Sequence, residues 1–134
     1  MKLLTHQLRD RLLRNGRLNA ERAANGEAEA DLLPVVKLFT PDANCSWLLS
    51  ELDPEEPDIA FGLCDLGMGC PELGCVRISE LETLRGTLGL PVERDLHFKA
   101  VYPLVIYARA AWNACAITED PDSLAAIAAK EGAA

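Results

Sequence analysis

Three runs of strand-forming residues decide the fold of this chain: Val35-Val36-Lys37-Leu38-Phe39, Trp47-Leu48-Leu49-Ser50-Glu51-Leu52 and Ile59-Ala60-Phe61-Gly62-Leu63-Cys64-Asp65-Leu66. Turn-forming residues follow the first two: Thr40-Pro41-Asp42 comes after the first run, and two prolines with four acidic residues fill positions 53–58. Proline fixes φ and lacks an amide donor, and acidic side chains prefer water, so both segments predict solvent-exposed turns. Short strands joined by such turns predict an antiparallel sheet.

The second run is apolar at consecutive positions, Trp47, Leu48 and Leu49, rather than at alternate ones. A strand with this pattern meets protein on both faces, so we expect it inside the sheet. In the third run the small residues Ala60, Gly62 and Cys64 share one face. That face therefore has room for a bulky group, either the Trp47 ring or a helix.

Helical patterns precede the three runs. Thr5 is placed to cap a helix with Leu8, Leu12 and Leu13 on one face, and Asn15-Gly16 predicts a left-handed stop. A second, weaker helical run from Leu18 to Ala24 follows, and it ends at Asn25-Gly26.

Shorter elements follow the three runs. Gly67, Gly69 and Gly74 predict tight turns, Val76–Ile78 a fourth strand, and Ser79-Glu80-Leu81-Glu82 a capping box that opens a short helix. Leu96–Ala100 is a candidate last strand, and helices are expected from about Pro103 and over Asp122–Lys130. The sequence thus predicts a single α+β domain, 1–134, with a central, mainly antiparallel sheet of four or five strands and N-terminal and C-terminal helices packed on it. Its parts are a helical segment (1–30), the sheet with one short helix (34–100) and the C-terminal helices (101–134).

Composition places the chain among globular cytoplasmic proteins. With 49% hydrophobic and 25% charged residues it resembles neither a disordered nor a membrane-spanning chain. The short apolar start meets charged residues at once, which argues against a secretory signal. Five cysteines and no such signal predict reduced thiols. Their spacing does not suit zinc, so we expect neither a metal site nor a cofactor.

The net charge of −8 is concentrated in one part of the chain. Between Asp42 and Glu82 there are ten acidic residues against Arg77 alone. Such a surface repels nucleic acid directly and attracts a basic protein, although acidic loops can also serve solubility alone. The predicted binding residues are Glu51, Asp53, Glu55, Glu56, Asp58 and Trp47.

Catalysis is the alternative interpretation. Asp53, Asp65 and Glu72, with His97, could gather as acid, base or magnesium ligands, although nothing in their spacing requires it. We expect Asp65 to bond the backbone of the following glycine turn instead. Gly67-x-Gly69 lacks the lysine of a P-loop. A Cys64–His97 nucleophilic pair lacks a third residue that would orient the imidazole.

Most of the chain resembles a known bacterial family, the domain of unknown function 2958 family. The resemblance rests on Leu3-Leu4-Thr5, Asn15-Gly16, the stretch from Pro34 to Pro41, Asp95-Leu96-His97-Phe98 and Tyr107-Ala108. It implies a small cytoplasmic protein often carried by plasmids and conjugative elements, and it supplies no catalytic residues to transfer. The sequence departs from the expected pattern at Cys45, Cys70 and Cys75.

Two functions therefore stay open. The first is an accessory protein of mobile elements that binds a basic partner, such as a DNA-processing protein or a host defence nuclease, with no direct nucleic-acid or membrane contact. The second is a small hydrolase-like or metal-dependent enzyme that uses Asp53, Asp65 and Glu72. We expect the first, as a monomer or a homodimer; an exposed Trp112 would indicate a dimer contact.

Overall fold

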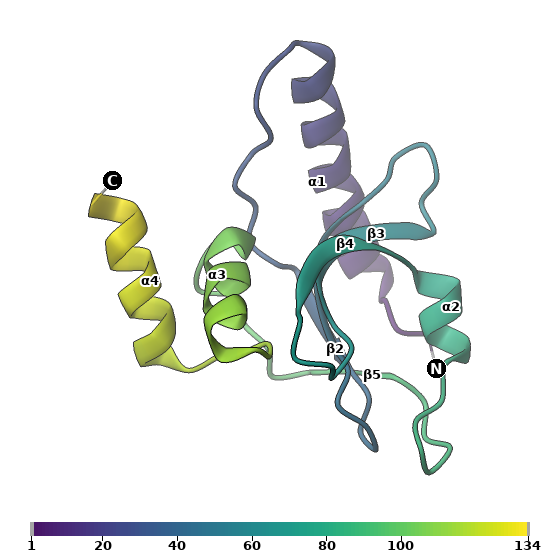
Figure 1. Ribbon diagram of the computed structural model, residues 1–134. Helices are drawn as coiled ribbons and strands as arrows, with labels where there is room; N and C mark the ends of the chain where they lie inside the picture. The colour runs from purple at the N-terminus through teal and green to yellow at the C-terminus, as the bar shows by residue number, and fades with distance from the viewer. Residues whose placement is uncertain (1, 134) are drawn as a thin grey trace.

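A computed structural model describes residues 2–133 and shows a five-stranded sheet with helices on both faces (Figure 1). The helices are α1 (His6–Ala24), α2 (Ile78–Thr83), α3 (Leu104–Ala114) and α4 (Pro121–Ala133). The strands are β1 (Val36–Phe39), β2 (Ser46–Leu52), β3 (Ile59–Asp65), β4 (Glu72–Arg77) and β5 (Glu93–Arg94). They lie in the order β4-β3-β2-β1-β5, and every pair is antiparallel. The predicted α+β class is confirmed.

The central strand β2 is buried on both faces, as its consecutive apolar residues predict. Trp47 and Leu49 belong to one core with residues of α1 and α2, whereas Leu48 belongs to a second core with residues of α3 and α4. Neighbouring residues of a strand point to opposite faces, so the two cores lie on opposite sides of the sheet. Burial of each such leucine contributes about 1.5–3 kcal/mol to stability.

The predicted helix break at Asn15-Gly16 is wrong, because α1 continues through both residues. Gly16 is buried, and a Cβ atom there would lie 1.8 Å from the carbonyl oxygen of Leu52. The glycine therefore lets the helix backbone approach the β2 backbone; it does not end the helix. The N-terminal prediction is confirmed, since the Leu8 amide donates to the Thr5 hydroxyl oxygen at 3.1 Å.

Two asparagines of α1 hold the helix against an irregular point of β2. The β2–β3 register shifts at Ser50, and the Asn15 side chain donates to the Ser50 carbonyl oxygen at 2.9 Å. One helical turn later, the Asn19 amide group donates to the Glu51 carboxylate at 3.0 Å. The Asn19 carbonyl oxygen accepts from the Ala30 amide at 2.8 Å. Asn19 thereby joins the helix, the sheet and the connection to β1.

The predicted capping box at Ser79 is also wrong. α2 begins one residue earlier, at Ile78, and its cap residue Arg77 makes no side-chain cap bond. The Asp58 carboxylate accepts hydrogen bonds from the Ser79 amide at 2.9 Å and the Ser79 hydroxyl at 2.6 Å. A carboxylate from the β2–β3 turn thus replaces the local cap, a long-range contact that the local sequence pattern does not contain.

Two strand boundaries differ from the prediction. β4 begins at Glu72, not at Val76, because it pairs with β3 over its whole length. Residues 96–100 form no strand; the final strand is β5, which pairs with β1. The reason is local, since the Asp95 carboxylate accepts from the His97 amide at 2.8 Å and turns the chain there.

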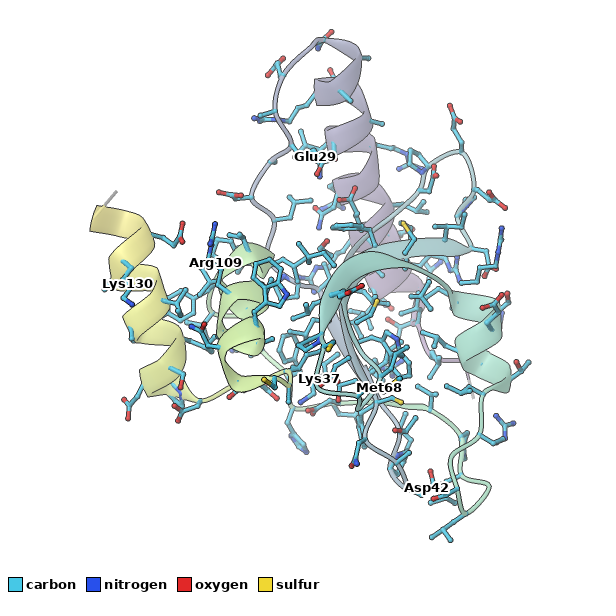
Figure 2. The ribbon with its side chains drawn as sticks, viewed as in Figure 1. Glu29, Lys37, Asp42, Met68, Arg109 and Lys130 are labelled. Atoms are coloured by element: carbon cyan, nitrogen blue, oxygen red, sulfur yellow. The ribbon has the colours of Figure 1, made fainter. Side chains whose placement is uncertain are left out.

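The loop 85–91 is fastened to the β1–β2 turn by three hydrogen bonds to Asp42, one of them from the Thr87 hydroxyl to the Asp42 backbone carbonyl oxygen at 2.7 Å. Asp42 accepts hydrogen bonds from the amides of Leu88 at 2.7 Å and Leu90 at 3.1 Å. Figure 2 shows Asp42 at the end of the molecule opposite Glu29, which lies beside α1. Polar contacts of α1 therefore fasten one end of the sheet, and the contacts of Asp42 fasten the other end.

The two C-terminal helices lie side by side: α3 packs on the second face of the sheet, and α4 packs on the far side of α3 (Figure 1). α3 begins directly after Pro103, close to the predicted start, and ends at Ala114, with Cys115 as its cap residue at a φ of +61°. An ion pair of 2.8 Å between Arg109 and Glu131 joins α3 to α4 at the surface. Within residues 2–133, each helix is too short or too polar to cross a membrane.

Candidate binding groove

A groove of about 280 Å³ lies between α1 and the β2–β3 hairpin. Three carboxylates line it, those of Glu29, Glu51 and Asp53, together with the apolar side chains of Ile59 and Phe61. We call this site, defined by these five residues, the acidic groove. A smaller cavity of about 150 Å³ continues it toward α3 and shares three of its residues.

Local structure explains how the carboxylates come together. The register shift at Ser50 sets Glu51 opposite Phe61, so the carboxylate and the aromatic ring share one face of the sheet. Asn19 then fixes the Glu51 carboxylate and, through the Ala30 amide, the segment that carries Glu29. The groove is therefore built by the same contacts that dock α1.

The acidic groove carries the negative charge of three carboxylates, and no basic side chain from the described part of the chain lines it. Burial raises the pKa of Glu51; the hydrogen bond from Asn19 opposes this, and the charges of Glu29 and Asp53 raise the pKa further. Among residues 2–133, none of the three carboxylates lies within 4.0 Å of a basic side chain. A cationic group bound there would relieve the repulsion among them.

The predicted acidic residues divide into two sets. Glu51 and Asp53 line the acidic groove. Glu55 is exposed at the turn, where its amide donates to the Asp53 carboxylate at 2.9 Å. Glu56 forms an ion pair of 3.0 Å with Arg77, and Asp58 caps α2. Hydrogen bonds from Ser79 hold the pKa of Asp58 below its usual value. Glu56 and Asp58 therefore already have partners within the chain.

The prediction that Trp47 contacts a ligand needs correction. Its side chain is only 2% exposed and packs in the core between the sheet and α1, so it presents no binding surface. Trp112 is the accessible tryptophan, at 48% exposed, and its indole nitrogen donates to the Pro71 carbonyl oxygen at 2.9 Å. Sequence reasoning missed Glu29, because its place in the groove depends on the contact between Asn19 and Ala30.

The proposed catalytic carboxylates do not meet. Asp65 pairs with the first residue of β2, whereas Asp53 follows the last, so they lie about 20 Å apart along the hairpin. Glu72 pairs with Cys64, the neighbour of Asp65, and therefore points to the opposite face from Asp65. His97 is exposed in a turn and lines none of the cavities described above.

Asp65 has a structural role that the sequence anticipated in part. It is 5% exposed, and one carboxylate oxygen accepts from the Gly67 amide at 2.9 Å, as expected for a turn-capping residue. The other oxygen accepts from the Ile117 amide at 3.0 Å, which ties the β3 end to the segment after α3. Gly67 and Gly69 adopt positive φ angles of 76° and 80°, which explains the glycines at this turn.

A larger, open cleft of about 620 Å³ lies at the Asp65 end of the sheet. It contains Lys37, whose ammonium group already forms an ion pair of 2.5 Å with Glu119. Cys64 is half-buried nearby in β3, and burial raises the pKa of its thiol, which disfavours the reactive thiolate. Within residues 2–133, no group of three or more histidine, cysteine or acidic side chains is arranged to hold a metal ion.

Fold and groove together define a small antiparallel α+β protein with an anionic site on one end of its sheet. The chain belongs to the family described as Protein of unknown function (DUF2958), whose model matches residues 3–118. The match includes all five strands and the entire acidic groove, whereas α4 lies beyond it. Comparisons with curated proteins and with solved structures give no match.

Proposed function

We propose that this protein is a non-catalytic binding protein of bacterial mobile elements, which acts in the cytoplasm and receives a lysine or arginine side chain of a basic protein partner in the acidic groove. One observation carries the proposal. Three carboxylates line the same groove as the apolar side chains of Ile59 and Phe61, and none of the three has a basic partner within residues 2–133. A cationic ligand supplies the missing countercharge.

The dimensions of the groove suit one long side chain. Its volume of about 280 Å³ is just below the range of about 300–1,000 Å³ that is typical of small-molecule sites. The methylene groups of a lysine or arginine would cover Ile59 and Phe61 while the charged end meets the carboxylates. Arginine is the better fit, because its planar group can also stack on the Phe61 ring.

The charge of the whole chain favours the same class of partner. A net charge of −8 accelerates encounters with a basic surface and opposes direct contact with nucleic acid. Proteins that handle DNA present basic surfaces. The partner would be an element-encoded DNA-processing protein or a host nuclease whose DNA site this protein occupies. The mobile-element setting is what the family resemblance implies.

The test compares two triple variants of equal net charge. The groove variant carries Glu29→Gln, Glu51→Gln and Asp53→Asn, and the control carries Glu82→Gln, Glu93→Gln and Asp122→Asn, which lie outside the groove. The probe is the capped tripeptide acetyl-Gly-Arg-Gly-amide, titrated by NMR, with its glutamine counterpart as a neutral reference. We expect the groove variant to bind the arginine peptide at least about tenfold more weakly, as the loss of charge-assisted hydrogen bonds predicts. Equal binding by both variants would show unspecific attraction and refute the proposal.

Capture from a lysate of a bacterium that carries the element then addresses the natural partner. A basic protein retained by the wild type and by the control variant, and lost with the groove variant, is the expected result. Retention by all three proteins would show that the partner does not bind at the acidic groove.

A further inference from the structure

The outer edge of β4 is open. β4 is the last strand in the sheet order, and its six residues pair in continuous register with β3 on the inner side. None of the turn, loop and side-chain hydrogen bonds within residues 2–133 reaches the backbone of residues 72–76. Amide and carbonyl groups along the outer side are therefore free to pair with another extended chain.

This edge lacks the features that usually prevent pairing. β4 contains no lysine, no proline and no register shift, and its two charged residues are at its ends. Leu73 in the strand is 38% exposed, and Trp112 of α3 is 48% exposed. Both line a surface pocket of about 510 Å³ at the start of the strand. An open strand beside an exposed apolar pocket is the surface that peptide-binding domains use for strand addition.

Charge decides between the possible occupants of this edge. Cys75 of β4 lines the acidic groove, and Glu72 is exposed at the other end of the strand. A second copy of the chain would bring another net charge of −8 to the same edge. A basic segment of a different protein would neutralise both acidic features.

We propose that an extended basic segment of the partner adds to β4 as an antiparallel sixth strand, with a basic residue two positions before an apolar one. The proposal rests on the function proposed for the acidic groove and specifies how the partner's chain reaches it.

The spacing follows from the register. Leu73 and Cys75 pair with Leu63 and Phe61, so both point to the α3 side of the sheet. Residues of an added strand that lie opposite them point the same way, about 4.8 Å further out. The residue opposite Leu73 lies at the pocket that Trp112 lines, and a long basic side chain opposite Cys75 enters the acidic groove from its β4 rim, which Cys75 lines. In an antiparallel strand the basic residue comes first.

The probe is the peptide acetyl-Thr-Val-Thr-Arg-Thr-Leu-Thr-amide, in which arginine precedes leucine by two positions. Two further peptides carry N-methyl groups on alternate residues, one on each set of amides. Only one set faces β4, so we expect one methylated peptide to bind about tenfold more weakly and the other to bind like the parent. The parent peptide should also slow hydrogen exchange of β4 amides and change the fluorescence of Trp112.

The outcomes separate this inference from the proposed function. If both methylated peptides bind like the parent while the arginine→glutamine peptide does not, strand addition is wrong and the groove keeps its role. If the glutamine peptide binds as well as the parent, the groove proposal fails. A concentration-dependent dimer in sedimentation, with β4 amides protected without peptide, would assign the edge to a second copy and overturn the inference.

Discussion

Substitution of Gly16 by alanine tests whether close approach of α1 to β2 determines stability. Alanine favours an isolated helix by about 1 kcal/mol over glycine. In the folded protein, however, its Cβ atom would lie 1.8 Å from the Leu52 carbonyl oxygen. The atom in the way belongs to the backbone at the end of the central strand β2, so the helix must move by about 1.2 Å to restore even a 3.0 Å separation.

The expected loss follows from what that movement breaks. Overpacking of this kind costs about 1–3 kcal/mol. The hydrogen bonds of Asn15 and Asn19, at 2.9 and 3.0 Å, would lengthen and lose about 1 kcal/mol each. After the gain in helix propensity, we expect Gly16→Ala to lower the free energy of unfolding by about 2–4 kcal/mol.

Urea unfolding followed by circular dichroism measures this difference directly. The matched control is Gly74→Ala in β4, where an added Cβ atom meets nothing within 4 Å, so a change within about 0.5 kcal/mol is expected. A Gly16→Ala protein as stable as the wild type, or more stable, would show that propensity outweighs the contact and would refute the reasoning.

Three further substitutions have outcomes that the structure specifies. Glu51→Gln should stabilise the protein at pH 7. Burial raises the pKa of Glu51 above 4.5 in the folded state, so the folded protein holds this proton more tightly than the unfolded chain does. The folded protein therefore loses stability as pH rises through the folded-state pKa of Glu51, and glutamine removes this loss. Thermal unfolding from pH 4 to 8 should show the difference vanish below about pH 4.5; a difference that is constant with pH would contradict this sign. Asp42→Ala should cost about 1.5–3 kcal/mol and speed hydrogen exchange at the Leu88 amide, whereas unchanged exchange would show that the loop holds without this carboxylate. Asp65→Asn should cost about 1–3 kcal/mol in urea unfolding, since an amide nitrogen then faces the backbone N–H of Gly67 or Ile117; wild-type stability would show that these bonds contribute little.

Local patterns in the sequence predicted the parts of the fold that depend on neighbouring residues. The consecutive apolar residues of β2 indicated burial on both faces, Thr5 indicated a helix start, and Asp65 indicated a turn cap. Each depends on residues within a few positions, which a sequence pattern contains directly. The strand-like pattern at 96–100 failed for an equally local reason, the hydrogen bond from the His97 amide to Asp95.

Long-range contacts account for the other differences. The dipeptide Asn15-Gly16 suggested a helix end. Its sequence is the same whether the glycine ends a helix or lets two backbones approach closely, so the local pattern cannot distinguish the two roles. The cap of α2 comes from Asp58, 21 positions away from Ser79. Of the acidic groove, Glu51 and Asp53 were predicted from charge clustering, whereas Glu29 required knowledge of how the α1–β1 connection folds back.

The sheet order also constrains how the chain folds. The four strands from β1 to β4 follow one another in space as they do in sequence, and each connection between them is six residues long. Closing loops this short has a small entropic cost, so the strands can pair progressively as they leave the ribosome. Leu48 and Leu63 would then stay uncovered until α3, which is synthesised later, packs on this face of the sheet. Until it does, one face of the nascent sheet stays exposed to other chains in the cell.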